Sequence, residues 1–333
     1  MMFPRGLTFD DVTLVPAYGN DSRDDASVEA WLGRYRFDIP IIAANMDTIA
    51  GVRMVVTMGQ LGGLGILHRF MSVRENVCAY RLAQSVLRGG AVGVSIGVQE
   101  GERERAAALY GVGARLFCVD VAHAHSGRVR QMVGYLKDTY NDLYIIAGNV
   151  CTYEGASYLV DAGADAVKIG CGAGSVCTTR EIAGVGVPQL SAIMDCARVD
   201  RPIIADGGIR KPGDVVKALA AGADMVMLGG MLAGTNEACG GTTYRGMSSV
   251  ETMKGRLGGR PEWRTAEGIS TRVEPKGPVA GVIREIVGGI RSGLSYVGAK
   301  SLDELRQKAC FMEVSRAAYL EGRPHGREHS VGL

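Results

Sequence analysis

Eight short apolar runs recur along this chain, and their spacing limits the fold more than any other feature. Each run is rich in Val, Ile and Ala and ends at or next to Gly, Asn, Asp or His. Segments with helical periodicity, such as residues 155–162 and 212–221, separate most of them. Strands that are apolar throughout indicate a parallel sheet covered on both faces. The predicted strands are residues 39–45, 64–68, 91–97, 116–123, 143–150, 166–170, 202–208 and 225–230.

Two of these units nearly repeat each other, at residues 161–170 and 220–229. In both, a helix that ends at Gly leads into a strand that ends at Gly. Repetition of one βα unit favours a closed (β/α)8 TIM barrel, although a doubly wound open sheet has a similar pattern. We predict an α/β fold with a single barrel domain over residues 1–333. It has an irregular loop and flap insertion at 231–275, amphipathic helices at 278–322 and a loose tail at 323–333.

The composition argues against several classes of partner. The net charge is +2, with acids and bases interspersed, so we expect neither a nucleic-acid nor a membrane partner. The eight cysteines lack paired spacing, which suits reduced thiols in a cytoplasmic protein. The N-terminus lacks a secretory apolar region, and the apolar runs are too short to span a bilayer.

A glycine-rich loop at residues 172–179 carries Cys177 directly after the predicted strand 166–170. A cysteine thiolate is the strongest nucleophile that a side chain supplies near neutral pH. Cysteines are more often inert and buried, but the glycines, Ser175, Thr178 and Thr179 argue against an apolar environment here. The loop therefore predicts a nucleophile held beside an anion-binding backbone.

In a barrel, the carboxyl ends of all strands meet at one mouth, where residues are functional rather than part of the core. Asp206-Gly207-Gly208 ends the seventh predicted strand, and Gly229-Gly230 ends the eighth. Barrels commonly bind a phosphate through backbone N–H groups at this position. Paired glycines also make tight turns, but two pairs after adjacent strands favour a phosphorylated ligand. Asp206 is placed to hold a sugar hydroxyl, or else to cap the next helix, and Ser175 could supply a further donor.

Residues 263–268 lie within the insertion and suggest a mobile flap. Glu267 stands beside Gly268 and could bring a carboxylate to the site, although such an acid is more often solvated. Trp263 and Arg264 add an aromatic plane and a cation to the same segment.

Seven motifs, in their order along the chain, resemble those of the inosine monophosphate dehydrogenase and guanosine monophosphate reductase superfamily of (β/α)8 barrels. The resemblance covers nearly the whole chain. The motifs are residues 7–12 (LTFDDV), 44–48 (ANMDT), 147–150 (AGNV), 174–180 (GSVCTTR), 184–192 (GVGVPQLSA), 204–208 (IADGG) and 245–249 (RGMSS).

Two features favour the reductase branch of this superfamily. Dehydrogenases usually carry regulatory domains after the second strand, whereas residues 67–73 here continue through one helix to the third strand. Dehydrogenases also use an Arg-Tyr pair on the flap to activate water, and residues 262–268 contain none. The resemblance implies NADPH-dependent reductive deamination of GMP to IMP and ammonia, through a thioimidate on Cys177. An IMP dehydrogenase without regulatory domains, using NAD, and a non-catalytic purine-nucleotide-binding barrel remain alternatives.

The resemblance also implies roles for individual residues and an assembly as a homotetramer. Cys177, Thr179 and Glu267 would be catalytic. The nucleotide would contact Ser175, Asp206, Gly207, Gly208, Gly229, Gly230, Gly246, Met247, Ser248, Arg264 and Gly268. NADPH would contact Ser22, Arg23, Arg69, Asp120, Val121, Ala122, Met247, Trp263 and Arg264. A potassium ion would be held by carbonyls of Gly172, Gly174 and Cys177, with Arg180 beside them. Compared with the superfamily, the loop at 235–244 is shorter.

Overall fold

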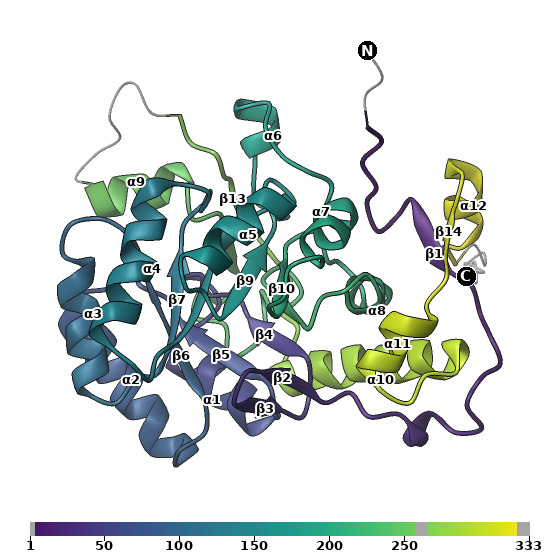
Figure 1. Cartoon of the computed structure of the whole chain (residues 1–333), viewed down its shortest axis with the longest axis horizontal. Coiled ribbons are helices and arrows are strands. Elements are labelled where there is room, and N and C mark those ends of the chain that lie inside the picture. Colours follow the sequence, from purple (N-terminus) through teal and green to yellow (C-terminus); the bar gives the residue numbers. More distant parts are fainter. Residues whose placement is uncertain (1–3, 258–264, 325–333) are drawn as a thin grey trace, which may run out of the picture.

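The computed structural model describes residues 4–257 and 265–324, and its centre is a closed barrel of eight parallel strands (Figure 1). The last barrel strand pairs with the first, Val226 with Ile41, which closes the ring. All eight predicted strands are present, each somewhat shorter than predicted. Their bounds are β4 (Ile41–Ala43), β5 (Leu64–Leu67), β6 (Val92–Ile96), β7 (Leu116–Asp120), β8 (Tyr144–Val150), β9 (Ala166–Ile169), β10 (Ile203–Asp206) and β11 (Met225–Leu228).

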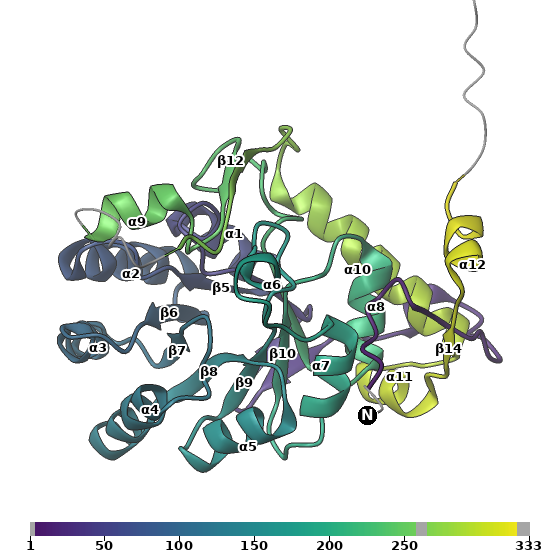
Figure 2. The same ribbon diagram turned by 90° about the horizontal axis from the view of Figure 1, so that it is seen from above.

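Helices surround these strands and cover their outer face (Figure 2), while the inner face packs against side chains within the closed barrel. This cover explains why the strands are apolar throughout rather than alternately. The helices that follow the barrel strands β4 to β10 are α1 (Val52–Gln60), α2 (Val73–Leu87), α3 (Glu102–Gly111), α4 (Gly127–Thr139), α5 (Tyr153–Asp161), α6 (Thr179–Ile182), α7 (Gln189–Cys196) and α8 (Pro212–Ala220). Three more, α10 (Val279–Val297), α11 (Leu302–Lys308) and α12 (Arg316–Glu321), complete the C-terminal part.

Helix α10 shows how sequence spacing sets the packing of this outer layer. Ile283, Ile286 and Ile290 are buried and recur at three- and four-residue spacing, which places them on one helical face. A Cβ atom at Gly293 would lie 2.5 Å from Val216 of α8, so the missing side chain permits close approach of the two helices. We therefore attribute the tight α8–α10 contact to small residues on α10.

Three short antiparallel sheets lie outside the barrel, and two of them differ from the sequence prediction. The 231–275 insertion, predicted as irregular, forms β12 (Thr243–Arg245), α9 (Val250–Leu257) and β13 (Ser270–Arg272), with β12 paired to β13. The 278–322 region, predicted as helical, contains β14 (Phe311–Glu313), which pairs with β1 (Val12–Leu14). The third sheet joins β2 (Ala30–Leu32) to β3 (Tyr35–Phe37).

The β1–β14 pair joins the two ends of the chain on one side of the molecule (Figure 1). A 3₁₀ turn at Arg23–Asp25 follows β1 and is linked to α10 through an Asp24–Arg291 ion pair. Most of the predicted tail, residues 325–333, lies outside the described residues.

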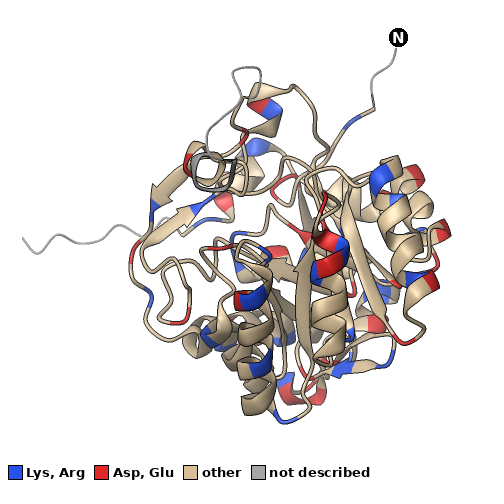
Figure 3. Cartoon of the chain, turned by 90° about the vertical axis from the view of Figure 1, so that its left-hand side faces the viewer, with Lys and Arg blue, Asp and Glu red and all other residues tan. Residues whose placement is uncertain are grey.

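Lys and Arg positions alternate with Asp and Glu positions along the ribbon shown in Figure 3. Among the described helices, none combines the length and the apolarity that crossing a bilayer requires.

Candidate active site

A cavity of about 440 Å³ lies at the carboxyl ends of the barrel strands. Loops from several strands contribute to its wall, as the barrel geometry predicts. The residues predicted from sequence that line it are Ala122, Gly172, Gly174, Ser175, Cys177, Thr179, Arg180, Asp206, Gly207, Gly208, Gly229, Gly230, Gly246, Met247, Ser248 and Glu267.

Cys177 stands on the loop between β9 and α6. The Gly174 carbonyl accepts the Cys177 amide N–H at 3.0 Å, which makes a tight turn just before the thiol. The Cys177 Sγ lies 3.2 Å from Thr179 Oγ1, within hydrogen-bonding distance. Because Cys177 is only partly buried and lines the cavity, its thiol is accessible to a ligand there.

The base of the predicted flap packs directly against this loop. Gly268 forms β-bridges with Cys177 on one side and with Ser249 on the other. The Thr178 N–H donates to the Glu267 carbonyl at 3.1 Å, and the Ile269 N–H donates to the Val176 carbonyl at 3.0 Å. These backbone contacts bring Glu267, 90 residues away in sequence from Cys177, to the same wall of the cavity.

The glycine pairs form a cradle of backbone that lines the cavity beside the loop that carries Ser175 and Cys177. Gly207 and Gly208 have φ values of 101° and 76°, in the left-handed region that other residues avoid. A Cβ atom at Gly230 would lie 2.9 Å from Ser175 Oγ, so only glycine leaves space beside that hydroxyl. Exposed N–H groups and a hydroxyl around a gap of this kind suit an anion such as phosphate.

Tyr244 belongs to this cradle and was not predicted from the sequence. Its phenol lines the cavity and lies 3.4 Å from Ser175 Oγ, which donates to it. Burial raises the pKa of Tyr244, so the phenol stays protonated and can donate to an anion. The only sequence signal was its position directly before the Arg245–Ser249 motif. The pairing of β12 with β13 places it beside Gly229 and Gly230.

A charged network lies beneath the cavity, within the barrel. Lys168 on β9 is 2% exposed, and its Nζ lies 2.8 Å from Asp120 Oδ1 and 2.8 Å from Asp206 Oδ2. The Asn149 amide donates to Asp206 Oδ2 at 3.0 Å, and its oxygen accepts from Lys168. Burial opposes the charge on Lys168, but the two carboxylates outweigh burial and raise its pKa. The network fixes both aspartates at the strand ends.

The predicted cofactor residues fall into three groups. Asp120, Val121, Ala122 and Arg69 gather at the ends of β5 and β7; of these, Ala122 reaches the cavity wall. Burial would raise the pKa of Asp120, but the charges of Lys168 and Arg69 lower it, so the carboxylate is ionised. Ser22 and Arg23 lie at the 3₁₀ turn beside α10, and the structure does not bring them to the cavity. Trp263 and Arg264 lie outside the described residues.

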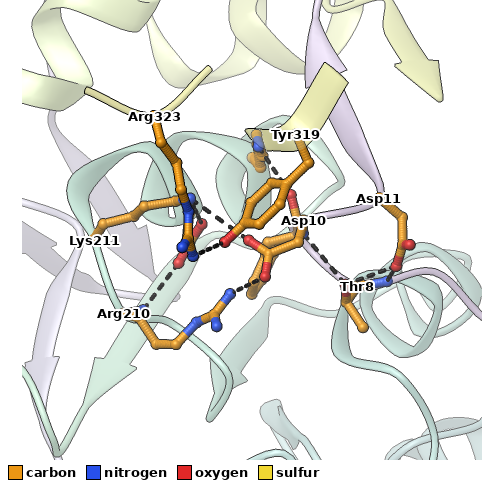
Figure 4. Close-up of polar contacts among 10 residues, drawn as sticks. Thr8, Asp10, Asp11, Arg210, Lys211, Tyr319 and Arg323 are labelled. Carbon is orange, nitrogen blue, oxygen red and sulfur yellow. Dashed lines mark hydrogen bonds and ion pairs between the residues drawn. The ribbon is translucent and has the colours of Figure 1, made fainter. Parts of the chain in front are cut away.

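The N-terminal segment forms a further wall that the sequence analysis missed. Thr8, Phe9 and Asp10 line the cavity, and Asp10 pairs with Arg210, which lines it too (Figure 4). Lys211 Nζ lies 3.5 Å from the other Asp10 oxygen and 5.3 Å from the centre of the Tyr319 ring on α12. The C-terminal helix thus supports a wall made by the N-terminus.

The loop after β9 suits the predicted monovalent cation in its donor type. Backbone carbonyls are the ligands that bind potassium in proteins, and Gly172, Gly174 and Cys177 place three of them on one short loop. The Arg180 side chain cannot be a ligand, because a guanidinium has no acceptor and this one donates to the Val187 carbonyl. Only its carbonyl could take part.

Comparison with known proteins agrees with this geometry. The model of the IMP dehydrogenase / GMP reductase domain family matches residues 6–325. The chain is 33% identical over 466 residues to an inosine-5'-monophosphate dehydrogenase from Aquifex aeolicus, covering 96% of this chain and 95% of the relative. It is 33% identical over 477 residues to a GMP reductase from Leishmania major, covering 97% of each. It is 37% identical over 386 residues to an inosine-5'-monophosphate dehydrogenase from Cryptosporidium parvum, covering 97% of this chain and 96% of the relative.

The chain therefore belongs to the IMP dehydrogenase / GMP reductase family of oxidoreductases, as its motifs predicted. The alignments with the Aquifex dehydrogenase and the Leishmania reductase both extend well beyond the 333 residues of this chain, so both relatives carry inserted residues. The presence or lack of inserted residues therefore does not by itself separate the two activities.

Proposed function

We propose that this chain is a GMP reductase, which converts GMP to IMP and ammonia at the expense of NADPH. The observation that carries the proposal is the meeting of three groups at one cavity wall: the Cys177 thiol, the Thr179 hydroxyl 3.2 Å from it, and Glu267 on the docked flap base. Together they provide a nucleophile and two proton-transferring groups, and the flap sequence at 262–268 contains no Arg-Tyr pair.

In the first step, the Cys177 sulfur attacks C2 of the guanine ring. The bond from C2 to the exocyclic nitrogen then breaks, and the nitrogen leaves as ammonia after taking a proton. We assign delivery of that proton to Thr179, whose Oγ1 lies 3.2 Å from the sulfur, and to Glu267, which lines the same cavity. The product of this step is a thioimidate between Cys177 and the purine.

In the second step, C2 must receive a hydride, and the bond to sulfur then breaks to release IMP and the thiolate. A bound reduced nicotinamide supplies that hydride. The residues at the β7 end suit such a ring: Ala122 offers an apolar wall, and the Asp120 carboxylate is ionised and held by Lys168. The flap segment 262–268 lacks the Arg-Tyr pair that dehydrogenases of this family use to activate water, which supports hydride transfer over hydrolysis.

The cradle of glycine residues would hold the nucleotide. The N–H groups of Gly207, Gly208 and Gly230, with the hydroxyls of Ser175 and Tyr244, provide donors for a phosphate. The Asp206 carboxylate is ordered by Lys168 and Asn149 and could accept hydrogen bonds from the ribose hydroxyls. A potassium ion at the carbonyls of residues 172, 174 and 177 would order the nucleophile's loop.

IMP dehydrogenase activity is the second candidate, because several similar relatives carry that name. The decisive assay gives purified protein GMP with NADPH, or IMP with NAD, and follows nicotinamide absorbance. Loss of NADPH with GMP alone supports the reductase. Formation of NADH with IMP alone would overturn it in favour of the dehydrogenase, and nucleotide binding without turnover in either mixture would indicate a non-catalytic barrel.

The family resemblance also leads us to propose a homotetramer. Light scattering coupled to size-exclusion chromatography tests it directly, since a tetramer has four times the 35.2 kDa of the chain.

A further inference from the structure

A lysine outside the cavity lies directly behind the glycine cradle. Lys276 stands between β13 and α10 and is not one of the residues that line the cavity. Its Nζ donates to the Gly230 carbonyl at 3.0 Å and to the Met231 carbonyl at 3.0 Å. An ammonium has three donors, so this one side chain can hold two consecutive peptide units of the turn after β11.

The backbone around Lys276 fixes the point from which this side chain extends. The Lys276 N–H donates to the Gly234 carbonyl at 2.8 Å, and the Asn236 N–H donates to the Gly277 carbonyl at 2.9 Å. Thr235 and Gly277 form a parallel β-bridge between these two bonds. The lysine is therefore anchored by its main chain against the same loop that its ammonium contacts.

Two N–H groups on this turn have no partner. The Gly230 and Met231 N–H groups make no hydrogen bond with any residue that the structure describes. The N–H groups of residues 232 and 233 differ, because both donate to the Gly229 carbonyl at 3.0 Å. Successive free backbone N–H groups form a concavity that binds anions. The turn thus offers two adjacent donors next to the Ser175 hydroxyl, which lies 2.9 Å from where a Cβ atom at Gly230 would stand.

The carbonyls that Lys276 binds determine where these N–H groups point. The peptide bond between Gly230 and Met231 is trans, so its N–H points opposite to its C=O. The Gly230 carbonyl faces Lys276, and the Met231 N–H therefore points away from the lysine. The Met231 carbonyl belongs to the next peptide unit, whose N–H donates to Gly229, so the second bond from Lys276 steadies the turn. Because Gly230 lines the cavity and Lys276 does not, the direction away from the lysine leads toward the cavity.

The charge of Lys276 has no counterpart within the described part of the chain. Lys168, Lys211 and Lys308 each lie within 4.0 Å of a carboxylate oxygen. No described carboxylate forms such a pair with Lys276, and partial burial alone lowers its pKa. An anion close to a lysine favours the charged form. A ligand that brings negative charge to the cradle would supply what the protein does not.

We propose that Lys276 is the positioning residue of the glycine cradle and makes it selective for a phosphomonoester. The lysine holds the turn so that the Gly230 and Met231 N–H groups meet the phosphate oxygens, and its ammonium adds a positive charge behind them. The side chain itself does not touch the ligand. This role rests on the phosphate site of the proposed function and deepens it: a nucleoside 5′-monophosphate gains affinity from Lys276, whereas the nucleoside gains none.

The test measures binding rather than turnover. Isothermal titration calorimetry follows GMP, ribose 5-phosphate and guanosine on the full chain carrying Cys177→Ala, which prevents covalent attachment. Adding Lys276→Met should weaken GMP and ribose 5-phosphate about 10–100-fold, the range for hydrogen bonds that involve a charged group. Guanosine lacks the phosphate and should bind equally with and without the lysine. A general disturbance of the cavity would instead weaken guanosine as well.

Two further variants make the comparison specific. Lys276→Arg keeps the charge and the donors to the two carbonyls, and it should restore most of the GMP affinity. Lys308→Met is the matched control: Lys308 Nζ also donates to a backbone carbonyl, that of Gly298 at 2.7 Å, but α11 does not line the cavity. It should leave all three affinities unchanged. If circular dichroism shows that Lys276→Met does not fold, Lys276→Gln takes its place, with a loss of the same selectivity expected because the charge is removed.

Equal GMP binding with and without Lys276→Met overturns the proposal, and so does a loss of guanosine binding as large as the loss of GMP binding. Neither result bears on the reaction, which the nicotinamide assay tests separately in the chain with Cys177 intact. A chain that reduces no GMP, yet loses ribose 5-phosphate affinity with Lys276→Met, would contradict the proposed reductase and support the role of Lys276. A chain that binds no phosphomonoester contradicts both.

Discussion

Lys168 Nζ lies 2.8 Å from Asp206 Oδ2, beneath the floor of the candidate active site. The same ammonium lies 2.8 Å from Asp120 Oδ1, so one buried cation connects β9 with β7 and β10. Asp206 is proposed to bind the ribose, and Asp120 is proposed to contact the nicotinamide. The ion network therefore couples the position of the two ligands to a single side chain that is 2% exposed.

Replacing Lys168 by Met should strongly destabilise the protein. The substitution leaves two carboxylates close together without their cation, and breaking a buried ion pair in this way costs about 3–5 kcal/mol. Urea unfolding followed by circular dichroism measures the change. The matched control is Lys308→Met. Lys308 Nζ lies 2.6 Å from Glu304 on the surface, and removing this exposed ion pair should cost less than about 1 kcal/mol of stability. Equal midpoints for the two variants would contradict the assigned importance of the network.

Stability should fall in acid partly through Asp120. Its folded-state pKa is depressed, because the charges of Lys168 and Arg69 outweigh burial, whereas the unfolded chain has an Asp pKa of about 3.9. The stability that the Asp120 carboxylate contributes is fully present above its pKa in the unfolded chain. It is lost as the pH falls through its lower pKa in the folded protein. Unfolding free energies between pH 6 and pH 3 should therefore decline more steeply for the wild type than for Asp120→Asn. If the two variants lost unfolding free energy equally with falling pH, Asp120 would not contribute to the acid sensitivity of the fold.

Adding a methyl group at Gly246 should separate the flap base from the nucleophile's loop. A Cβ atom there would lie 2.7 Å from the Val176 carbonyl oxygen and 3.1 Å from Gly268 Cα, which are backbone atoms that cannot rotate away. We expect Gly246→Ala to lower kcat about 10²-fold, as for a displacement of about 1 Å, while circular dichroism stays native. Gly281→Ala on α10 is the control: a Cβ atom there meets nothing within 4 Å, and turnover should not change.

The proposed chemistry makes unequal demands on its three residues. Cys177→Ala should abolish turnover, because no other group can form the thioimidate. Glu267→Gln and Thr179→Val should each lower kcat by about 10²–10⁴-fold, the usual range for the loss of a proton-transferring group. Stopped-flow measurement of ammonia release from GMP separates the first step from the second. Full turnover by Cys177→Ala would eliminate the covalent mechanism.

The barrel could be predicted from the sequence because each of its strands is marked locally. A run such as Ile203–Asp206 is apolar until the residue that reaches the mouth, and this pattern does not depend on distant partners. β14 lacks such a mark. Phe311–Glu313 is three residues long, partly exposed, and becomes a strand only because Val12–Leu14 pairs with it from the other end of the chain.

The site shows the same division. Cys177 and the glycine pairs were predictable, because special residues stand directly after strands. Tyr244 was not, since its position beside Ser175 depends on the pairing of β12 with the distant strand β13. Lys168 was missed for another reason: a lysine within an apolar run gives no sign that Asp120 and Asp206 will lie on either side of it.

The pairing of β1 with β14 also determines when the cavity is completed during synthesis. The wall at Thr8–Asp10 leaves the ribosome long before the strand that anchors it, residues 311–313. The Val314 N–H donates to the Asp11 carbonyl at 2.8 Å, directly beside that wall. Domains fold as the chain emerges from its N-terminal end, so the barrel strands can assemble while this wall still lacks its anchor. A nascent chain stalled before Phe311 would thus hold the nucleophile and the glycine cradle but an unanchored substrate wall, so the ligand-binding cavity stays incomplete until residues 311–313 have been synthesised.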